Sequence, residues 1–170
     1  MARVEPGVPL VRFYQWAQGP MERMLFGLLS RIVAKNIKAC VVVADQNHAA
    51  RLDDALWTQG NDSFLPHGIC GGADSAWHPI LLCTEPQDIN GASVLLLAHG
   101  RFEERFGDFD MVLDFVPGHT AEGVQASRDR YRRYRDSGCR MEYWIHTPES
   151  GWRLNFRHPK TNEETSATKG

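Results

Sequence analysis

Apolar residues follow two different spacings along the first third of the chain. Bulky residues from Val11 to Trp16 predict a strand, whereas apolar residues recur at helical spacing from Met21 to Asn36. A continuous apolar run with three valines extends from Lys38 to Ala44 and is typical of a strand buried on both faces. Asp45 is a favourable N-cap residue, so a second helix is expected to continue to about Trp57.

The rest of the chain predicts further strands and helical segments in alternation. The strands are expected at 79–84, 93–98, 111–116 and 140–145, and the helical segments at 102–106 and 121–137. Buried strands that alternate with helices predict an α/β fold, namely a three-layer α-β-α sandwich around a mostly parallel sheet.

The end of the chain differs in composition from what precedes it. We expect one α/β domain over residues 1–146 and a largely disordered C-terminal extension over 147–170, since little apolar content follows Phe156. Within the extension, Trp152, Leu154 and Phe156 are the only hint of a docking strand.

The overall composition limits the class of protein. The chain has 170 residues, of which 42% are hydrophobic and 24% charged, as in an ordinary globular domain. A net charge of -2 and a pI near 6.4 do not indicate a generally basic, nucleic-acid-binding domain, so any basic surface is expected to be local. We expect a cytoplasmic protein without membrane contact, because the N-terminus lacks a secretory pattern and the apolar runs are too short to cross a bilayer. The scattered cysteines favour free, buried thiols: Cys40, Cys70, Cys83 and Cys139.

The sequence contains no recognisable catalytic or cofactor-binding motif. Neither a GxGxxG nor a GxxxxGK[ST] phosphate-binding loop is present, and there is no GxSxG nucleophile elbow. His67 and Cys70 have HxxC spacing, but a zinc site would need a second pair, so a turn histidine beside a buried thiol is the better interpretation. Asp53 and Asp54 are adjacent on a helix and face different ways. We therefore expect no catalytic residue, no metal and no cofactor.

An apolar loop follows the second helix. Phe64, Leu65 and Pro66 lie between turn-forming stretches at 60–63 and 68–72. Such a cluster either plugs the core or meets a partner. Composition alone favours the core plug.

The strongest local charge lies on the third long helix. The segment RDRYRRYR, residues 128–135, holds five arginines and two tyrosines. Arg128 is one turn from Tyr131, and an arginine beside an aromatic pocket can bind a carboxylate while the ring packs on an apolar group. The alternative is a solvated helix face whose tyrosines reach the core.

Several of these segments resemble one protein family. LDDALW followed by SFLPHG is similar to the signature of the chi subunit of bacterial DNA polymerase III, and FYQW, ERF, LDFVP and RDRYRRYRDSG follow in the family's order. The resemblance covers roughly residues 10–146. It implies a nucleotide-binding-like topology without a phosphate loop, and a noncatalytic subunit that links the clamp loader of the DNA polymerase III holoenzyme to single-stranded DNA-binding protein during replication.

The resemblance also implies a binding site for the acidic C-terminal tail of single-stranded DNA-binding protein, which ends in phenylalanine. Arg128 would pair with the carboxylates of that tail, and Val116 and Tyr131 would line a pocket for its terminal ring. Val124 lies in the region where the better-known family pattern has a lysine. The protein would thus reach DNA indirectly.

A second site follows from the same resemblance. Phe64, Leu65 and Pro66 match the loop that docks the psi subunit, although another clamp-loader or helicase-like partner is an alternative. Two other functions stay open on the residues alone. One is a small nucleotide- or nucleic-acid-binding enzyme on a Rossmann-like fold. The other is direct DNA binding through the arginine-rich helix.

Overall fold

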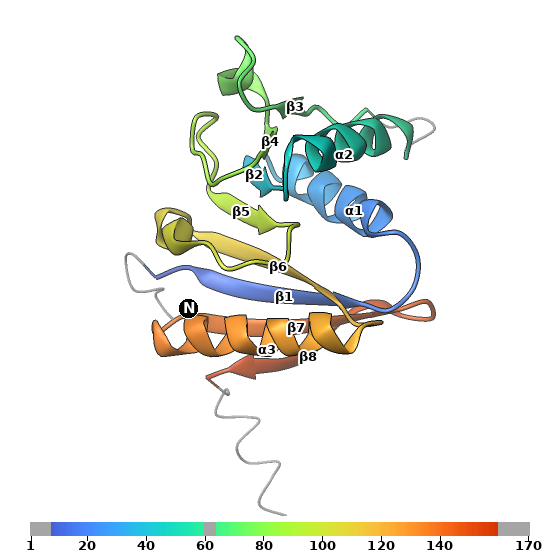
Figure 1. Cartoon of the computed structure of the whole chain (residues 1–170), viewed down its shortest axis with the longest axis vertical. Helices are drawn as coiled ribbons and strands as arrows, with labels where there is room; N and C mark the ends of the chain where they lie inside the picture. Colours follow the sequence, from blue (N-terminus) through green and yellow to red (C-terminus); the bar gives the residue numbers. More distant parts are fainter. Residues whose placement is uncertain (1–7, 60–63, 160–170) are drawn as a thin grey trace, which may run out of the picture.

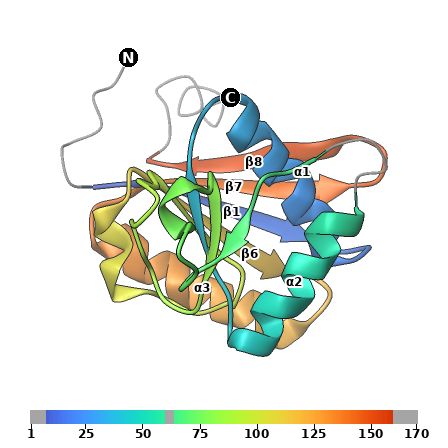
Figure 2. The same ribbon diagram turned by 90° about the horizontal axis from the view of Figure 1, so that it is seen from above.

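The protein is built around one sheet with helices on both faces. The computed structural model describes residues 8–59 and 64–159. Helices α1 (Met21–Ala34) and α2 (Gln46–Thr58) cover one face, and α3 (Ala121–Asp136) covers the other (Figures 1 and 2). This arrangement confirms the three-layer α/β fold expected from the alternating pattern.

The sheet has eight strands in the order β3-β4-β2-β5-β6-β1-β7-β8. Their bounds are β1 Leu10–Trp16, β2 Ala39–Val42, β3 Gly68–Ile69, β4 Ile80–Cys83, β5 Val94–Leu97, β6 Met111–Pro117, β7 Arg140–Thr147 and β8 Gly151–His158. All neighbouring strands are parallel except β7 and β8, which confirms a mostly parallel sheet. Every residue of β2, β4 and β5 is buried, which explains their unbroken apolar runs.

Helices α2 and α3 begin where the sequence supplies a capping side chain. The Asp45 side chain accepts a hydrogen bond of 2.7 Å from the backbone N–H of His48 at the start of α2. Thr120 caps α3 in the same way. Two short 3₁₀ helices, Ser75–Trp77 and Glu104–Asp108, connect strands.

The strands divide the core into two layers. On the side of α3, Phe13 and Val116 pack with Tyr134 of that helix. On the side of α1 and α2, Tyr14 and Phe115 pack with the helix leucines. Adjacent residues of one strand therefore serve opposite faces, as the strand period requires.

The C-terminal extension contains a strand that the sequence analysis did not expect. β8 pairs antiparallel with β7 and continues the sheet. The ring of Trp152 lies 4.9 Å from that of Tyr14, and the ring of Phe156 lies 5.0 Å from that of Tyr143. A register shift in the β7–β8 pairing, between Tyr143 and Trp144, places Trp152 and Phe156 on opposite faces of the sheet. The expectation of disorder is thus wrong for Gly151–His158, because this strand pairs with β7 and its aromatic side chains pack on both faces. The part of that prediction concerning residues 160–170 lies outside the described residues.

The cysteines agree with the prediction of free thiols. Cys40, Cys83 and Cys139 are buried and Cys70 is half-buried, and all are free. Burial raises the pKa of the Cys139 thiol to about 11, so this side chain is neutral at physiological pH. Within the described residues, none of the helices is both long and apolar enough to span a membrane.

Candidate functional site

A groove lies on the α3 side of the sheet and has a volume of about 310 Å³. Side chains of β1, α3, β7 and β8 line it: Gln15, Val124, Ser127, Arg128, Tyr131, Arg132, Arg135, Tyr143 and Phe156. We call this surface the α3 groove. It brings together Val124, Arg128 and Tyr131, the three α3 residues that the sequence analysis assigned to one binding site.

The start of α3 is fixed by close packing on the end of β6. A Cβ atom at Gly123 would lie 2.5 Å from Cγ of Pro117 and 2.6 Å from Oγ1 of Thr120. These distances are too short for any side chain, so only glycine permits this approach. The backbone N–H of Gly123 donates to Oγ1 of Thr120 at 3.1 Å. The first turn of α3 therefore has one position relative to the sheet.

A buried ion pair holds the middle of α3 on the sheet. Arg130 donates through Nε and Nη2 to the two carboxylate oxygens of Asp114 on β6, both at 2.8 Å. Its Nη1 donates to the backbone oxygen of Gly100 at 2.7 Å. Burial raises the pKa of the Asp114 carboxyl, and the Arg130 guanidinium acts in the opposite direction. Arg130 is thus a structural residue and does not reach the groove.

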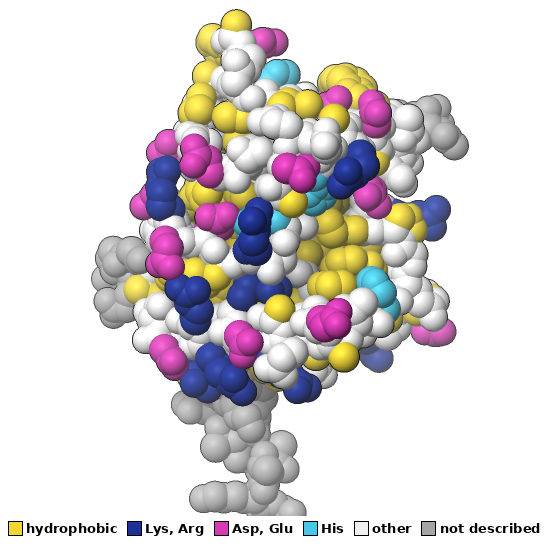
Figure 3. Space-filling model, in the orientation of Figure 1, with side chains coloured by type: hydrophobic (Ala, Val, Ile, Leu, Met, Phe, Trp, Pro, Cys, Tyr) yellow, Lys and Arg dark blue, Asp and Glu magenta, His cyan; other side chains and the backbone are white. Residues whose placement is uncertain are grey.

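The other α3 arginines differ in their partners. Three of them form ion pairs: Arg132 with Asp129 at 3.3 Å, Arg133 with Glu104 at 2.8 Å, and Arg135 with Asp136 at 3.1 Å. Arg128 has no carboxylate oxygen within 4.0 Å among the residues that the structure describes. In Figure 3, basic side chains gather along the lower part of the molecule, over α3, with acidic side chains between them. Arg128 is therefore the arginine of this helix that can bind an external anion without losing an internal partner.

Aromatic rings form the floor and one wall of the α3 groove. The Tyr131 ring lies 5.6 Å from that of Phe13 and 5.9 Å from that of Phe156. Phe156 also stacks on Tyr143, with an angle of 10° between the ring planes. The hydroxyl of Tyr143 donates to Oε1 of Gln15 at 2.5 Å, which fixes the Tyr143 ring. Burial raises the pKa of Tyr131 and of Tyr143, so both rings are neutral at physiological pH.

The structure departs from the expected site at some positions. Val116 is fully buried in the core and does not line the α3 groove. Conversely, the sequence analysis did not include Gln15, Tyr143 or Phe156. The signal for Phe156 was present, because Trp152, Leu154 and Phe156 recur at every second position as in a strand.

The apolar loop after α2 is partly a core plug and partly exposed. Leu65 is buried in the core and Pro66 is half-buried, whereas Phe64 is 69% exposed. Trp57 at the end of α2 is 53% exposed, and its ring lies 5.3 Å from that of Phe64. Residues 60–63, which the sequence analysis interpreted as turn formers, lie outside the described residues. Phe64 of the loop and Trp57 of α2 thus form a pair of exposed rings, and the buried side chain of Leu65 anchors the loop.

His67 holds this loop in place. Its Nδ1 lies 2.7 Å from the backbone oxygen of Leu65, and its Nε2 lies 3.0 Å from Oδ1 of Asp53 on α2. The side chain is buried, and both ring nitrogens are directed to groups of the protein. Within residues 8–59 and 64–159, no group of three His, Cys, Asp or Glu side chains has the arrangement of a metal site.

Sequence comparison identifies relatives over most of the chain. The model of the family described as "DNA polymerase III chi subunit, HolC" matches residues 9–142. The chain is 28% identical over 105 residues to DNA polymerase III subunit chi of Escherichia coli (strain K12), covering 61% of this chain and 71% of that protein. It is 24% identical over 122 residues to DNA polymerase III subunit chi of Haemophilus influenzae, covering 71% of this chain and 84% of that protein.

A solved structure shares the fold at much lower sequence similarity. T4 UvsW matches with a TM-score of 0.57 and 10% identity over 82% of this chain. The match covers 42% of the UvsW chain, so this protein spans less than half of UvsW. At this level of identity the similarity concerns the fold alone.

Proposed function

Because this chain belongs to the DNA polymerase III chi subunit family, we propose that it is a noncatalytic adaptor of the replicative polymerase. In this proposal the α3 groove binds the acidic C-terminal tail of single-stranded DNA-binding protein, and the Phe64 loop binds the clamp-loader side. The observation that carries the proposal is Arg128, an arginine without an ion-pair partner among the described residues, beside an aromatic groove.

The chemistry of the α3 groove matches that of an acidic peptide ending in a ring. A carboxylate can accept two parallel hydrogen bonds from the Arg128 guanidinium. A phenylalanine ring can then pack against Tyr131 and Phe156, which are exposed enough to line the groove. Val124 lies in the region where the better-known family pattern has a lysine. With one cation fewer, ring packing supplies a larger share of the binding free energy in this proposal.

Calorimetric titration with two peptides tests this site. One is a short acidic peptide that ends in phenylalanine, and the other lacks that residue. Arg128→Ala should weaken binding of the first peptide about tenfold to a hundredfold, since a hydrogen bond to a charged group contributes about 1.5–3 kcal/mol. Arg133→Ala is the matched control, because Arg133 lies on the same helix but binds Glu104 outside the groove.

The outcome distinguishes a specific site from a basic surface. Binding that requires the terminal phenylalanine, weakens with salt and depends on Arg128 supports the adaptor. Equal losses from Arg128→Ala and Arg133→Ala would mean that general positive charge attracts the peptide. Unchanged affinity in Arg128→Ala would remove this residue from the site.

The Phe64 loop has the form of an anchor for a second partner, the psi subunit or another clamp-loader or helicase-like protein. Two exposed rings on a buried Leu65 can dominate a small interface. Phe64→Ser should abolish co-purification with that partner and leave the melting temperature within about 2 °C, since an exposed side chain contributes little to folding. Trp77→Ser is the matched control, because Trp77 is 82% exposed and belongs to the 3₁₀ helix Ser75–Trp77 and not to the Phe64 loop. Retained co-purification in Phe64→Ser would contradict the assignment.

A further inference from the structure

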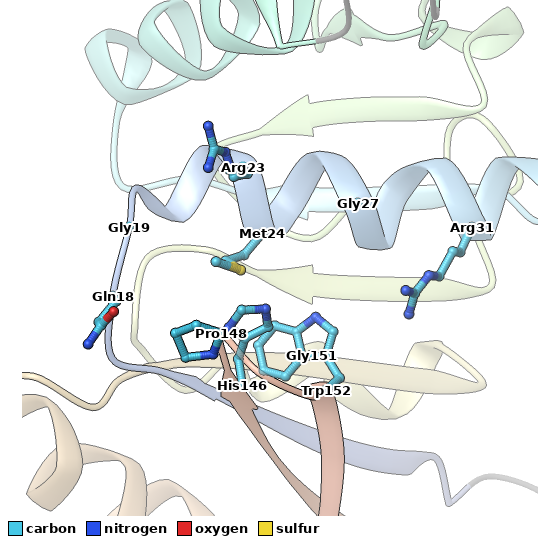
Figure 4. Close-up of a pocket in the computed structure, with 10 residues that line it drawn as sticks. All are labelled: Gln18, Gly19, Arg23, Met24, Gly27, Arg31, His146, Pro148, Gly151 and Trp152. Atoms are coloured by element: carbon cyan, nitrogen blue, oxygen red, sulfur yellow. The ribbon is translucent and has the colours of Figure 1, made fainter.

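A second groove lies on the opposite face of the sheet from α3. It runs between α1 and the β7–β8 hairpin and consists of two hollows of about 500 and 210 Å³. Both hollows are lined in part by Arg31 and Trp152, so they adjoin at these residues. Figure 4 shows the larger hollow, with Met24 and Arg31 of α1 directed toward Trp152 and His146 of the hairpin. We call this surface the α1 groove.

The α1 groove exists because the chain passes from β7 into β8, and no helix follows β7 within the described residues. In this sheet α3 covers the other face, and the chain returns from β7 directly into β8. On this face, α1 covers only part of the sheet. The side chains beyond it line the hollow, namely Tyr14, Trp144 and Trp152. A mid-helix glycine widens the opening, since a Cβ atom at Gly27 would meet no atom within 4 Å. Gly27 is thus not required by packing within the described residues, although glycine disfavours a helix interior.

The helix side of the α1 groove is basic. Arg31 lies in the last turn of α1 and Lys35 is the C-cap residue of that helix. Both side chains are exposed, and neither has a carboxylate oxygen within 4.0 Å in the part of the chain that the structure describes. Arg12 is paired with Glu142 at 3.3 Å. Arg23 lies at the rim and, in Figure 4, its side chain points away from the hairpin. Among residues 8–59 and 64–159, no acidic side chain lines either hollow, so these residues give the groove a positive charge that attracts anions.

The sheet side of the α1 groove is aromatic. Trp152 packs edge-on to Tyr14 at 4.9 Å and to His146 at 5.0 Å. The indole Nε1 of Trp144 is buried and has no acceptor within the described residues. The guanidinium of Arg12 lies 5.9 Å from the Trp144 ring. Flat rings facing the unpaired cations Arg31 and Lys35 suit a ligand that combines planar groups with oxyanions.

We infer that the α1 groove binds single-stranded nucleic acid, with phosphates along Arg31 and Lys35 and bases against Trp152 and Trp144. A single strand presents parallel rows of anions and planar rings, as this groove presents parallel rows of cations and aromatic rings. An acidic helix from a partner protein fits less well. A helix 10–12 Å across occupies about 500 Å³ per turn of 5.4 Å, so the larger hollow holds roughly one turn. This contact is direct, and so goes beyond the adaptor role, in which DNA is reached through another protein.

Fluorescence anisotropy with a labelled oligothymidylate of about 16 nucleotides tests the inference on the full chain. Wild-type protein should bind with a Kd below about 100 µM at moderate salt, the range of non-specific binding. Arg31→Ala combined with Lys35→Ala should lower the slope of log K against log salt by about 1.4, since each single-strand phosphate contact contributes about 0.7. Arg128→Ala in the α3 groove and Arg51→Ala on α2, made singly and together, are controls; the double control removes the same two positive charges elsewhere.

The aromatic row is tested separately from the charges. Trp152→Ala should weaken binding at least about fivefold through lost stacking, and Trp152→Phe should recover most of it. Gly27→Leu places a side chain in the open space beside the groove, where its Cβ atom would meet no atom within 4 Å, so it should block binding while the fold is kept. Circular dichroism and thermal melting of each variant establish that it is folded.

Several results would overturn the inference. One is no anisotropy change with wild-type protein up to about 100 µM. Another is loss of binding in Arg128→Ala with normal binding in Arg31→Ala/Lys35→Ala, which would place the nucleic acid on α3. A third is efficient displacement of the oligonucleotide from wild-type protein, but not from Arg128→Ala, by the acidic peptide ending in phenylalanine.

Discussion

Replacing Arg130 with methionine tests whether the buried pair positions α3 and, with it, the α3 groove. The side chain of Arg130 is 6% exposed and that of Asp114 is fully buried, so the variant leaves a carboxylate with no counter-charge. Removing one partner of a buried pair costs about 3–5 kcal/mol. The Gly100 carbonyl also loses its donor. Because domains of this kind have a total stability of about 5–15 kcal/mol, the loss is a large fraction of the whole.

Urea unfolding followed by tryptophan fluorescence measures this loss at pH 7. Arg132→Met is the matched control, since Arg132 lies on the same helix and its ion pair with Asp129 is more than 60% exposed. The control should change the free energy of unfolding by no more than about 0.5 kcal/mol. A comparable, small change in Arg130→Met would refute the reasoning that burial makes this pair important.

The pH dependence adds a second test of the same mechanism. Burial raises the pKa of Asp114, and the Arg130→Met variant removes the hydrogen bond and the charge that oppose this shift most. A folded-state pKa above the unfolded value of about 3.9 means that the folded protein binds the proton more tightly, so stability falls as pH rises between the two values. The deficit of Arg130→Met relative to wild type should therefore be largest near pH 7 and should shrink toward about pH 4. A deficit that does not change with pH would show that lost packing, not an unpaired carboxylate, is responsible.

Three further predictions concern the groove residues and the extension. Gly27→Ala should raise the free energy of unfolding by about 0.5–1 kcal/mol in a urea titration, because the added methyl group meets open space; a loss would show hidden crowding. Phe156→Ala should weaken binding of the phenylalanine-ended peptide about fivefold in calorimetry, since an aromatic pair contributes about 0.5–1.5 kcal/mol; unchanged affinity would exclude this ring from the pocket. A chain ending at Thr147 should melt at least about 5 °C below one ending at Pro159, because loss of Trp152 uncovers Tyr14; equal melting temperatures would show that β8 does not stabilise the sheet.

The central part of the fold could be predicted because its pattern is local. Strands β2, β4 and β5 are buried on both faces, so their residues form unbroken apolar runs that few other structures produce. β8 was missed because its apolar residues alternate with polar ones in a polar stretch, where the composition suggested disorder. Its stability comes from pairing with β7, a contact that the composition of the tail does not reveal.

The candidate site shows where local patterns are insufficient. Arg128 and Arg130 are the same residue type two positions apart, yet one lines a groove and the other is buried. The difference depends on Asp114, which is 16 residues earlier on β6, and on the Gly100 carbonyl. Val116 likewise lies on the α3 side of the sheet, but other side chains cover it. The LDFVP motif therefore indicates which strand lies near the site, and not which of its side chains line the groove.

The strand order also determines how the two proposed partners would act together. The Phe64 loop leads into β3 at one edge of the sheet, and the α3 groove is built on β7 and β8 at the other. Six inter-strand spacings separate β3 from β7, which is about 29 Å at about 4.8 Å each. Across such a stiff sheet the two binding free energies should simply add, with no coupling between the sites. When one partner dissociates, the other still holds the protein nearby, so rebinding becomes an intramolecular step whose rate depends on tether length and not on bulk concentration.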